Sequence, residues 1–242
     1  MMMPTPDPFA RHLPLEGTRN VRDVGGYPAA GGRRTRWRTL LRSDELTRLP
    51  DHARRQLLGL GIRQVIDLRW PDELEQAPNV FRDTDGVRYR SVPLLADDPV
   101  PQVGLAGMYR HVFDVRAPQL AEVVRALLVD DGLPVVIGCA AGKDRTGVTI
   151  ALLLELAGVP LEVIVDDYAL SAGFFAQPRS HVDPADWRHP PLQVDSQPEL
   201  MAGALVHLQR AHGGARELLL AQGIDGTALD RLVGRLTEPA GA

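Results

Sequence analysis

The chain has 242 residues, of which 44% are hydrophobic and 24% are charged, and its formal net charge at pH 7 is -4. This mildly acidic balance argues against a nucleic-acid-binding protein, and the length fits one decorated α/β domain with a single core. The chain has one cysteine, which excludes an internal disulfide and a cysteine-rich zinc cluster and favours the reducing cytoplasm as its location.

The first 16 residues are predicted to form a mobile leader, and residues 17–242 a single domain. The leader is rich in proline and lacks a basic segment followed by an apolar run, so it does not resemble a signal peptide. The longest apolar run, around Val148 to Leu156, is far shorter than the roughly 20 residues that cross a bilayer. We therefore expect no membrane span.

The next elements alternate between strands and helices. Strands are expected over 37–41, 63–68, 87–92 and 135–137, and helical segments over 51–60, 71–76 and 146–156. The strongest amphipathic pattern comes from five apolar residues at helical spacing, which are Leu120, Val123, Val124, Leu127 and Leu128. This alternation predicts an α/β fold whose central, mostly parallel sheet is flanked by helices.

The C-terminal part is predicted to be helical. A helix is expected from Pro160 through Leu170, and three short helices between Pro198 and Leu236, the last of them capped by Asp225. Residues 176–190 are predicted to form an irregular loop. Three of its side chains, His181, Trp187 and His189, are expected to form a lid over the substrate or to be ordinary loop residues.

The only cysteine and the only lysine of the chain lie in one loop, Cys139-Ala140-Ala141-Gly142-Lys143-Asp144-Arg145. This loop connects a predicted buried strand to a predicted helix, so it lies at the carboxyl end of a strand and at a helix N-terminus. Free N–H groups and the positive end of the helix dipole favour a thiolate at Cys139 and an oxyanion above it, which Arg145 would clamp. The sequence therefore predicts an anion site at this loop.

Four strings, in this order, resemble a known family. They are Asn20-Val-Arg-Asp-Val-Gly-Gly26, Arg42-Ser43-Asp44, Asp67-Leu68-Arg69 with Glu73, and the loop extended through Thr146-Gly147. Together they resemble the bacterial tyrosine-specific phosphatases, which are cysteine-dependent, carry a C-x5-R loop and include mycobacterial and cyanobacterial members. The resemblance spans residues 20 to about 236. It implies a phosphotyrosine-phosphatase-like fold with a possible lid, and a phosphoric monoester hydrolase that uses no metal or cofactor.

The resemblance also assigns roles within the loop. Cys139 is the expected nucleophile that forms a cysteinyl-phosphate, and Arg145 is expected to bind two equatorial oxygens of the phosphoryl group. The backbone of residues 140–143, with a tight turn at Gly142, is expected to hold the remaining oxygens. Thr146 is expected to donate its hydroxyl to the sulfur.

Substrate recognition is expected at the rim of this loop. Lys143 is predicted to reach a further phosphate or acidic group. The resemblance implies a phosphotyrosine protein as substrate, with dual specificity for phosphoserine or phosphothreonine, or a phosphoinositide, as the alternatives. Ala140 argues against the lipid, because lipid phosphatases of the tensin class carry a lysine there. The sequence gives no indication of the oligomeric state.

Several aspartates compete for the role of general acid. Asp144 is favoured because its spacing alone places it near the leaving oxygen, while Asp97 and Asp98 follow a strand and Asp67 ends one. Other charged groups are interpreted as an ion-paired scaffold that braces the loop, namely Asp67, Arg69, Arg22 and Asp23, together with Asp44 and Glu73. Asp166 and Asp167 are expected on a solvated helix face.

Gly138 departs from the family pattern, in which a histidine precedes the cysteine. Glycine predicts a looser loop and a less acidic Cys139. The favoured hypothesis is an active enzyme with a raised pH optimum, and the alternative is a catalytically weak, phosphate-binding pseudophosphatase. Sulfur or arsenic chemistry of the rhodanese or arsenate reductase kind is disfavoured, because Cys139 has no resolving thiol.

Overall fold

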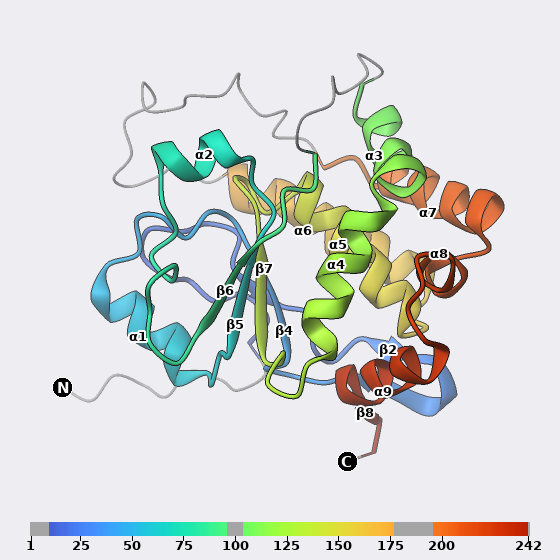
Figure 1. Ribbon diagram of the computed structural model, residues 1–242, viewed down its shortest axis with the longest axis horizontal. Coiled ribbons are helices and arrows are strands. Elements are labelled where there is room, and N and C mark those ends of the chain that lie inside the picture. The colour runs from blue at the N-terminus through green and yellow to red at the C-terminus, as the bar shows by residue number, and fades with distance from the viewer. Residues whose placement is uncertain (1–9, 96–103, 177–195, 242) are drawn as a thin grey trace.

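The computed structural model describes residues 10–95, 104–176 and 196–241 (Figure 1). Its centre is a five-stranded sheet in the order β1-β4-β7-β5-β6. The strands are β1 (Arg22–Asp23), β4 (Leu40–Ser43), β5 (Gln64–Asp67), β6 (Arg88–Ser91) and β7 (Val135–Gly138). All are parallel except β1, which pairs antiparallel with β4 at one edge. The predicted mostly parallel sheet is therefore confirmed.

Helices cover both faces of this sheet (Figure 1). One face packs against α1 (Asp51–Gly59) and the N-terminal segment. The other face carries most of the helices, which are α3 (Gly104–Val115), α4 (Ala117–Leu128), α5 (Asp144–Leu156), α6 (Leu161–Ala176), α7 (Pro198–His212), α8 (Ala215–Ala221) and α9 (Gly226–Leu236). The short α2 (Pro71–Gln76) lies near the carboxyl ends of the strands. Within the described residues, none of the helices has the length and hydropathy of a membrane span.

The strand β7 shows why the sheet has a core on each side. Val135 and Ile137 belong to the larger hydrophobic cluster, whereas Val136 between them belongs to the cluster on the α1 side. Successive side chains of a strand point to opposite faces, so a continuous run of β-branched residues is buried on both. This burial holds the loop after β7 on a rigid strand.

A second, small sheet joins distant parts of the chain. It contains β2 (Pro28–Ala29), β3 (Arg33–Thr35) and β8 (Thr237–Pro239), with a short 3-10 turn (Ala30–Gly32) between the first two. β8 pairs antiparallel with β3, and Arg33 Nη2 donates to the carbonyl oxygen of Thr237 at 2.9 Å. Neither this sheet nor its pairing was predicted from the sequence.

Other elements differ from the predictions in position. The strand expected over 37–41 lies at 40–43, and α3 was not predicted. Of the expected leader, residues 1–9 lie outside the described residues, while Leu13 and Leu15 are buried against the α1-side cluster, so packing extends N-terminal of residue 17. The expected irregular loop, with its possible lid, falls almost entirely outside the described residues.

Candidate active site

The site lies where three parallel strands end together. Gly138 is opposite Ser43 on one side and opposite Asp67 on the other, so the residues after β4, β5 and β7 meet at one edge of the sheet. Cys139 follows β7 directly and is only 2% exposed. The loop then enters the 13-residue helix α5 at Asp144, so the positive end of the helix dipole points at the loop.

The carbonyl groups of the loop are bound from outside. The Ala140 oxygen accepts from the N–H of Glu45 at 3.2 Å. Asn20 Nδ2 donates to the carbonyl oxygens of Ala141, at 3.0 Å, and of Gly142, at 3.1 Å. In the described part of the chain, the N–H groups of residues 140–142 donate to no backbone carbonyl. The C=O of one residue and the N–H of the next belong to one trans peptide and point in opposite directions. The bound carbonyls of Ala140 and Ala141 therefore turn the N–H groups of Ala141 and Gly142 away from the scaffold, where an anion can bind them.

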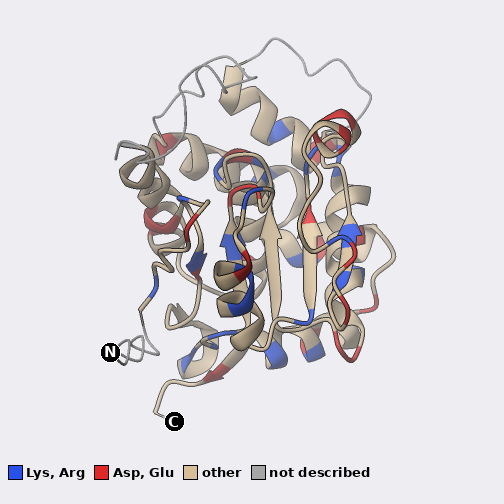
Figure 2. Cartoon of the chain, turned by 90° about the vertical axis from the view of Figure 1, so that its left-hand side faces the viewer, with Lys and Arg blue, Asp and Glu red and all other residues tan. Residues whose placement is uncertain are grey.

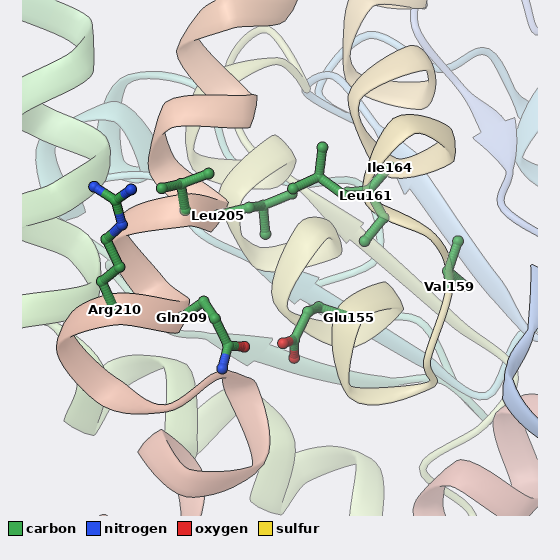
Figure 3. Close-up of a pocket in the computed structure, with 8 residues that line it drawn as sticks. Glu155, Val159, Leu161, Ile164, Leu205, Gln209 and Arg210 are labelled. Carbon is green, nitrogen blue, oxygen red and sulfur yellow. The ribbon is translucent and has the colours of Figure 1, made fainter.

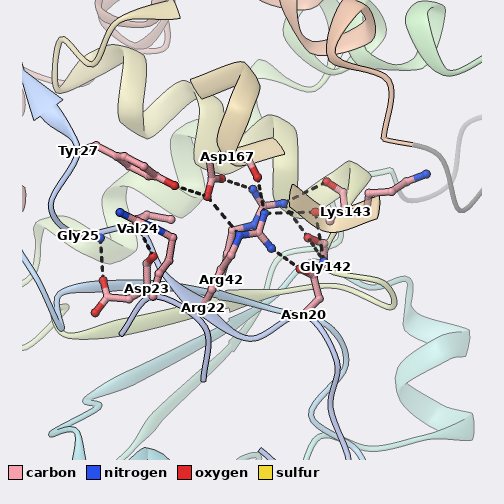
Figure 4. A network of polar contacts seen from close by, with 12 residues as sticks. Asn20, Arg22, Asp23, Val24, Gly25, Tyr27, Arg42, Gly142, Lys143 and Asp167 are labelled. Atoms are coloured by element: carbon pink, nitrogen blue, oxygen red, sulfur yellow. Dashed lines mark hydrogen bonds and ion pairs between the residues drawn. The ribbon is translucent and has the colours of Figure 1, made fainter. Parts of the chain in front are cut away.

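A buried ionic network supports the loop from behind (Figure 4). Arg42 Nη2 donates to the Gly142 carbonyl oxygen at 2.8 Å, and its Nη1 lies 2.5 Å from Asp167 Oδ2. Arg22 donates from Nε to Asp167 Oδ1 at 3.2 Å, and Tyr27 donates its hydroxyl to the same oxygen at 2.9 Å. The solvated position expected for Asp167 is therefore wrong, because two buried arginines face this side of α6.

The charges in this network shift the pKa values of its members. Burial acts to raise the pKa of Asp167, but Arg22 and Arg42 outweigh it and lower the pKa to about 2. Burial, followed by the like charge of Arg42, lowers the pKa of Arg22 to about 10. Asp167 is thus the negative charge that compensates two guanidinium groups under the loop.

Arg145 lies at the mouth of the loop and is oriented by α2. Its Nη1 and Nη2 lie 2.5 and 2.9 Å from the two carboxylate oxygens of Glu73, and its guanidinium lies 5.2 Å from the centre of the Trp70 ring. Burial acts to lower the pKa of Arg145, but the Glu73 hydrogen bond and the negative charge of Cys139 outweigh it, so the pKa is raised. Among the described residues, its Nε–H and second Nη2–H make no hydrogen bond, and this parallel pair matches a phosphate.

Asp67 and Arg69 form a buried ion pair. Arg69 donates from Nε to Asp67 Oδ1 at 3.0 Å and from Nη2 to Oδ2 at 2.9 Å. Asn79 Nδ2 also donates to Asp67 Oδ2 at 2.9 Å. A buried carboxylate with this many fixed partners is a structural group, which argues against Asp67 as the general acid. Asp97 and Asp98 lie outside the described residues.

Asp144 is the first residue of α5, and a tyrosine of α3 contacts it. Tyr109 donates its hydroxyl to Asp144 Oδ1 at 2.5 Å, and the Tyr109 and Tyr168 hydroxyl oxygens are 2.6 Å apart. Burial, Asp144 and Tyr168 raise the pKa of Tyr109 well above its ordinary value, so Tyr109 keeps its proton. Tyr109 was missed from the sequence because it lies in no motif.

Lys143 is buried, whereas the sequence led us to expect it exposed at the rim of the loop. Its side chain is 2% exposed, and Nζ lies 3.6 Å from Asp144 Oδ1. Figure 4 shows this side chain extending away from the Arg22 and Arg42 pair. Asp144 is therefore held from two sides, by an ammonium group and by a phenol.

Three further residues make contacts other than those expected from the sequence. Thr146 Oγ1 is buried and has no hydrogen-bond partner among the described residues, so the expected bond to the sulfur is not formed. Asp23 accepts from the N–H groups of Gly25 and Arg38, both at 2.8 Å, and thus braces a turn and not the loop. Asp44 accepts from the N–H groups of residues 19 and 20, which holds the segment that carries Asn20.

Gly142 and Gly138 both lie where a side chain would clash, but for different reasons. Gly142 has φ +64°, and a Cβ there would lie 2.4 Å from the Ser43 carbonyl oxygen, so only glycine fits. Gly138 lies in the ladder of β7, where a Cβ would meet Ser43 Oγ at 2.5 Å. The loosening expected from Gly138 is countered by strand pairing on both of its sides.

Two hollows lie near the loop and the helices behind it. The space that borders Cys139, lined in part by Ser43 and Asn79, is too narrow to hold a water molecule. A pocket between α5, α6 and α7 is lined by apolar and polar side chains and lies away from Cys139 (Figure 3). They include Leu161, Ile164 and Leu205, together with Glu155, Gln209 and Arg210. Acidic and basic residues are interspersed over the described elements (Figure 2).

Two curated proteins and one solved structure are similar to this chain. A tyrosine-protein phosphatase of Nostoc commune is 30% identical over 215 residues, which cover 81% of this chain and 73% of the relative. Triple specificity protein phosphatase PtpB of Mycobacterium tuberculosis is 31% identical over 202 residues, which cover 69% and 72% respectively. The solved structure of Pseudomonas aeruginosa TpbA overlaps 80% of this chain and 91% of its own, at 19% identity and a TM-score of 0.44.

The family model described as the tyrosine phosphatase family matches residues 13–238, a span that contains all four strings noted in the sequence. It also contains residues that contact the loop in the structure, among them Asn20, Arg42 and Glu73. Because the match covers nearly the whole chain, the resemblance seen in the sequence is confirmed. The chain belongs to the tyrosine phosphatase family, whose members are phosphoric monoester hydrolases.

Proposed function

We propose that the chain hydrolyses phosphotyrosine in proteins through a cysteinyl-phosphate, with no metal ion taking part in the reaction. One observation carries the proposal. Cys139 lies at a helix N-terminus beside Arg145, and Glu73 binds one side of that guanidinium, while its Nε–H and second Nη2–H have no partner in the part of the chain that the structure describes. A thiolate stabilised in this way is a nucleophile near neutral pH without a metal.

The reaction has two steps. In the first, the Cys139 thiolate attacks phosphorus, the bond from phosphorus to the tyrosine oxygen breaks, and Asp144 gives its proton to that oxygen. In the second, water attacks phosphorus and loses a proton to Asp144, and the S–P bond breaks to release phosphate and the thiolate. The N–H groups of the loop and Arg145 stabilise the charge on the equatorial oxygens during both steps.

Phosphotyrosine is the substrate that the surroundings of Lys143 favour. A further phosphate of a phosphoinositide would have to draw Lys143 away from Asp144, at 3.6 Å. The relative from Nostoc commune is named a tyrosine-protein phosphatase, which agrees with this choice, while the name of PtpB states a triple specificity. A phosphoinositide is therefore the second substrate to test.

Turnover, not mere phosphate binding, is the expected behaviour. The reason for a pseudophosphatase was a loosened loop at Gly138, but this residue is paired with both β4 and β5. The carbonyls of residues 140–142 are held by Asn20, Arg42 and Glu45. These contacts support a loop that is fixed before the substrate arrives, which lowers the cost of reorganisation in the transition state.

The test compares wild type with Cys139→Ser in EDTA, on a phosphotyrosine peptide, a phosphoserine peptide and phosphoinositide vesicles. We expect the wild type to release phosphate fastest from the phosphotyrosine peptide, and Cys139→Ser to lose at least about a thousandfold in kcat. Acid-quenched wild type should carry a labelled phosphoryl group on Cys139. Binding without hydrolysis would support the pseudophosphatase instead, and equal activity of the two proteins would refute the cysteine mechanism.

A further inference from the structure

A cluster of two histidines and one aspartate joins α3 to α7, away from the loop that carries Cys139. His207 Nε2 and His212 Nε2 each lie 2.7 Å from the same oxygen, Oδ1 of Asp114. The two imidazole rings are nearly perpendicular, with centroids 6.0 Å apart. The potential ligand atoms of the three residues all lie within 4.8 Å of one another.

This donor set is one that binds a transition metal. Two imidazole nitrogens and one carboxylate oxygen are common zinc ligands, whereas magnesium and calcium prefer oxygen alone. In a tetrahedral zinc site, neighbouring ligand atoms lie about 3.3 Å apart, given metal–ligand distances of about 2.0 to 2.1 Å. The 2.7 Å contacts therefore need to open by less than about 1 Å to admit the ion.

The side chains have the freedom for that opening. Asp114 is 42% exposed, His207 27% and His212 25%, so each can turn without breaking the hydrophobic core, and a water molecule can supply the fourth ligand. In the absence of a metal, the carboxylate can only accept, so each ring must hold a proton on Nε2. To bind an ion through Nε2, a neutral ring moves that proton to Nδ1, and an imidazolium keeps its Nδ1 proton and releases the other to water, so that the Nε2 lone pair becomes free.

We infer that Asp114, His207 and His212 form a binding site for one divalent transition-metal ion, of the zinc type, that fastens the end of α3 to the end of α7. The ion takes no part in phosphate chemistry. It acts on the helix that also carries Tyr109, whose hydroxyl contacts Asp144. The inference rests on the helix contacts alone and does not depend on the proposed reaction.

The test uses the full chain in a Cys139→Ser background, because the thiol would bind zinc itself. After removal of metals with EDTA and dialysis, the protein is titrated with Zn²⁺ by calorimetry and with Co²⁺ by visible absorption. We expect the bands of four-coordinate Co²⁺ and a rise in the thermal midpoint of about 5 °C at zinc near 100 times Kd. Mg²⁺ should give neither effect.

Matched variants locate the site. His207→Ala and His212→Ala should each lose the Co²⁺ bands and one Zn²⁺ per chain, whereas His52→Ala should keep both, since His52 has only the single carboxylate of Glu16 beside it, at 3.2 Å. Asp114→Asn, which keeps the shape of the side chain, should weaken binding at least about tenfold and serves if a histidine variant fails to fold. Unchanged zinc stoichiometry and affinity in these variants would overturn the inference.

Discussion

One edge of the Arg145 guanidinium binds a fixed carboxylate, and the other edge faces the space above the loop. Glu73 takes one N–H from each terminal nitrogen, and it is itself fixed because the Trp70 N–H donates to Glu73 Oε2 at 2.7 Å at the start of α2. A charged, bidentate contact of this kind sets the direction of the remaining N–H pair. The geometry of the site thus depends on a side chain that never touches the substrate.

Glu73→Gln should therefore lower activity without unfolding the protein. The amide keeps the size of the carboxylate but loses the charge that orients Arg145, so we expect kcat/KM to fall about tenfold, or roughly 1.4 kcal/mol of transition-state stabilisation. Steady-state kinetics on a phosphotyrosine peptide measures the effect. Glu75→Gln is the matched control, because Glu75 is exposed on the same helix. Equal losses in both variants would rule out the orienting role.

Asp144→Ala should lower turnover in a way that depends on the leaving group. A general acid matters most when the departing oxygen is a strong base, so we expect a loss of roughly 10² to 10⁴ for poor leaving groups and a much smaller loss for para-nitrophenyl phosphate. Tyr109→Phe should show the same pattern more weakly, because the contact that orients Asp144 is removed. A series of aryl phosphates gives the measurement, and an equal loss across the series would exclude Asp144 as the acid.

At the scale of elements, contacts from neighbouring elements fix the position of the loop between β7 and α5. Carbonyls of the loop accept from β4 and from the segment before β1, while α2 orients Arg145. Gly138 of β7 lies opposite Ser43 of β4, and Ser43 Oγ occupies the space that a Cβ at 138 would need. Ser43 Oγ is buried and has no partner among the described residues.

This contact predicts coupling between the two positions. Gly138→Ala should destabilise the protein by about 1 to 3 kcal/mol through overpacking, and Ser43→Ala should recover about 1 kcal/mol of that cost by removing the oxygen. Denaturant unfolding of the wild type, both single variants and the double variant measures the coupling. Strictly additive free energies would show that the two side chains do not compete for the same space.

The sequence predicted the elements and residues whose signals are local. The C-x5-R loop, the strand before it and the helix after it follow from neighbouring residues, and Asp225 caps α9 as expected by accepting from the Ala228 N–H at 3.1 Å. Asp167 was misplaced because its partners, Arg22 and Arg42, lie more than a hundred residues away. The helix α3 was missed although Tyr109, Val112 and Phe113 are buried at helical spacing along it.

At the scale of the whole molecule, the network around Asp167 joins the N-terminal segment, β4, the loop and α6. These parts come from positions as far apart as Asn20 and Ser171, which are joined by a hydrogen bond of 3.4 Å. A buried network of this kind stabilises the fold only while its charges stay compensated, because two unpaired guanidinium groups in the interior are costly.

Acid should therefore weaken the fold through Asp167. Its folded pKa of about 2 is below the ordinary 3.8, so it contributes stability above about pH 4, amounting to about 2 kcal/mol, that is lost as the pH falls towards 2. Asp167→Asn lacks this contribution and should be less stable at neutral pH by about 3 to 5 kcal/mol. Urea unfolding between pH 2 and 6 should show that the difference in free energy of unfolding between wild type and Asp167→Asn becomes smaller below pH 4. A difference that stays constant with pH would contradict the lowered pKa of Asp167.

Because β3 pairs with β8, the small sheet can form fully only after the C-terminal strand has been synthesised. Arg33 and Thr237, which are joined by a hydrogen bond of 2.7 Å, are 204 positions apart. On a translating ribosome, the hairpin of β2 and β3 emerges early and keeps an open edge until residues 237–239 have followed. For most of that time its backbone N–H and C=O groups are exposed to other nascent chains, so this edge is where a chaperone would have most to protect.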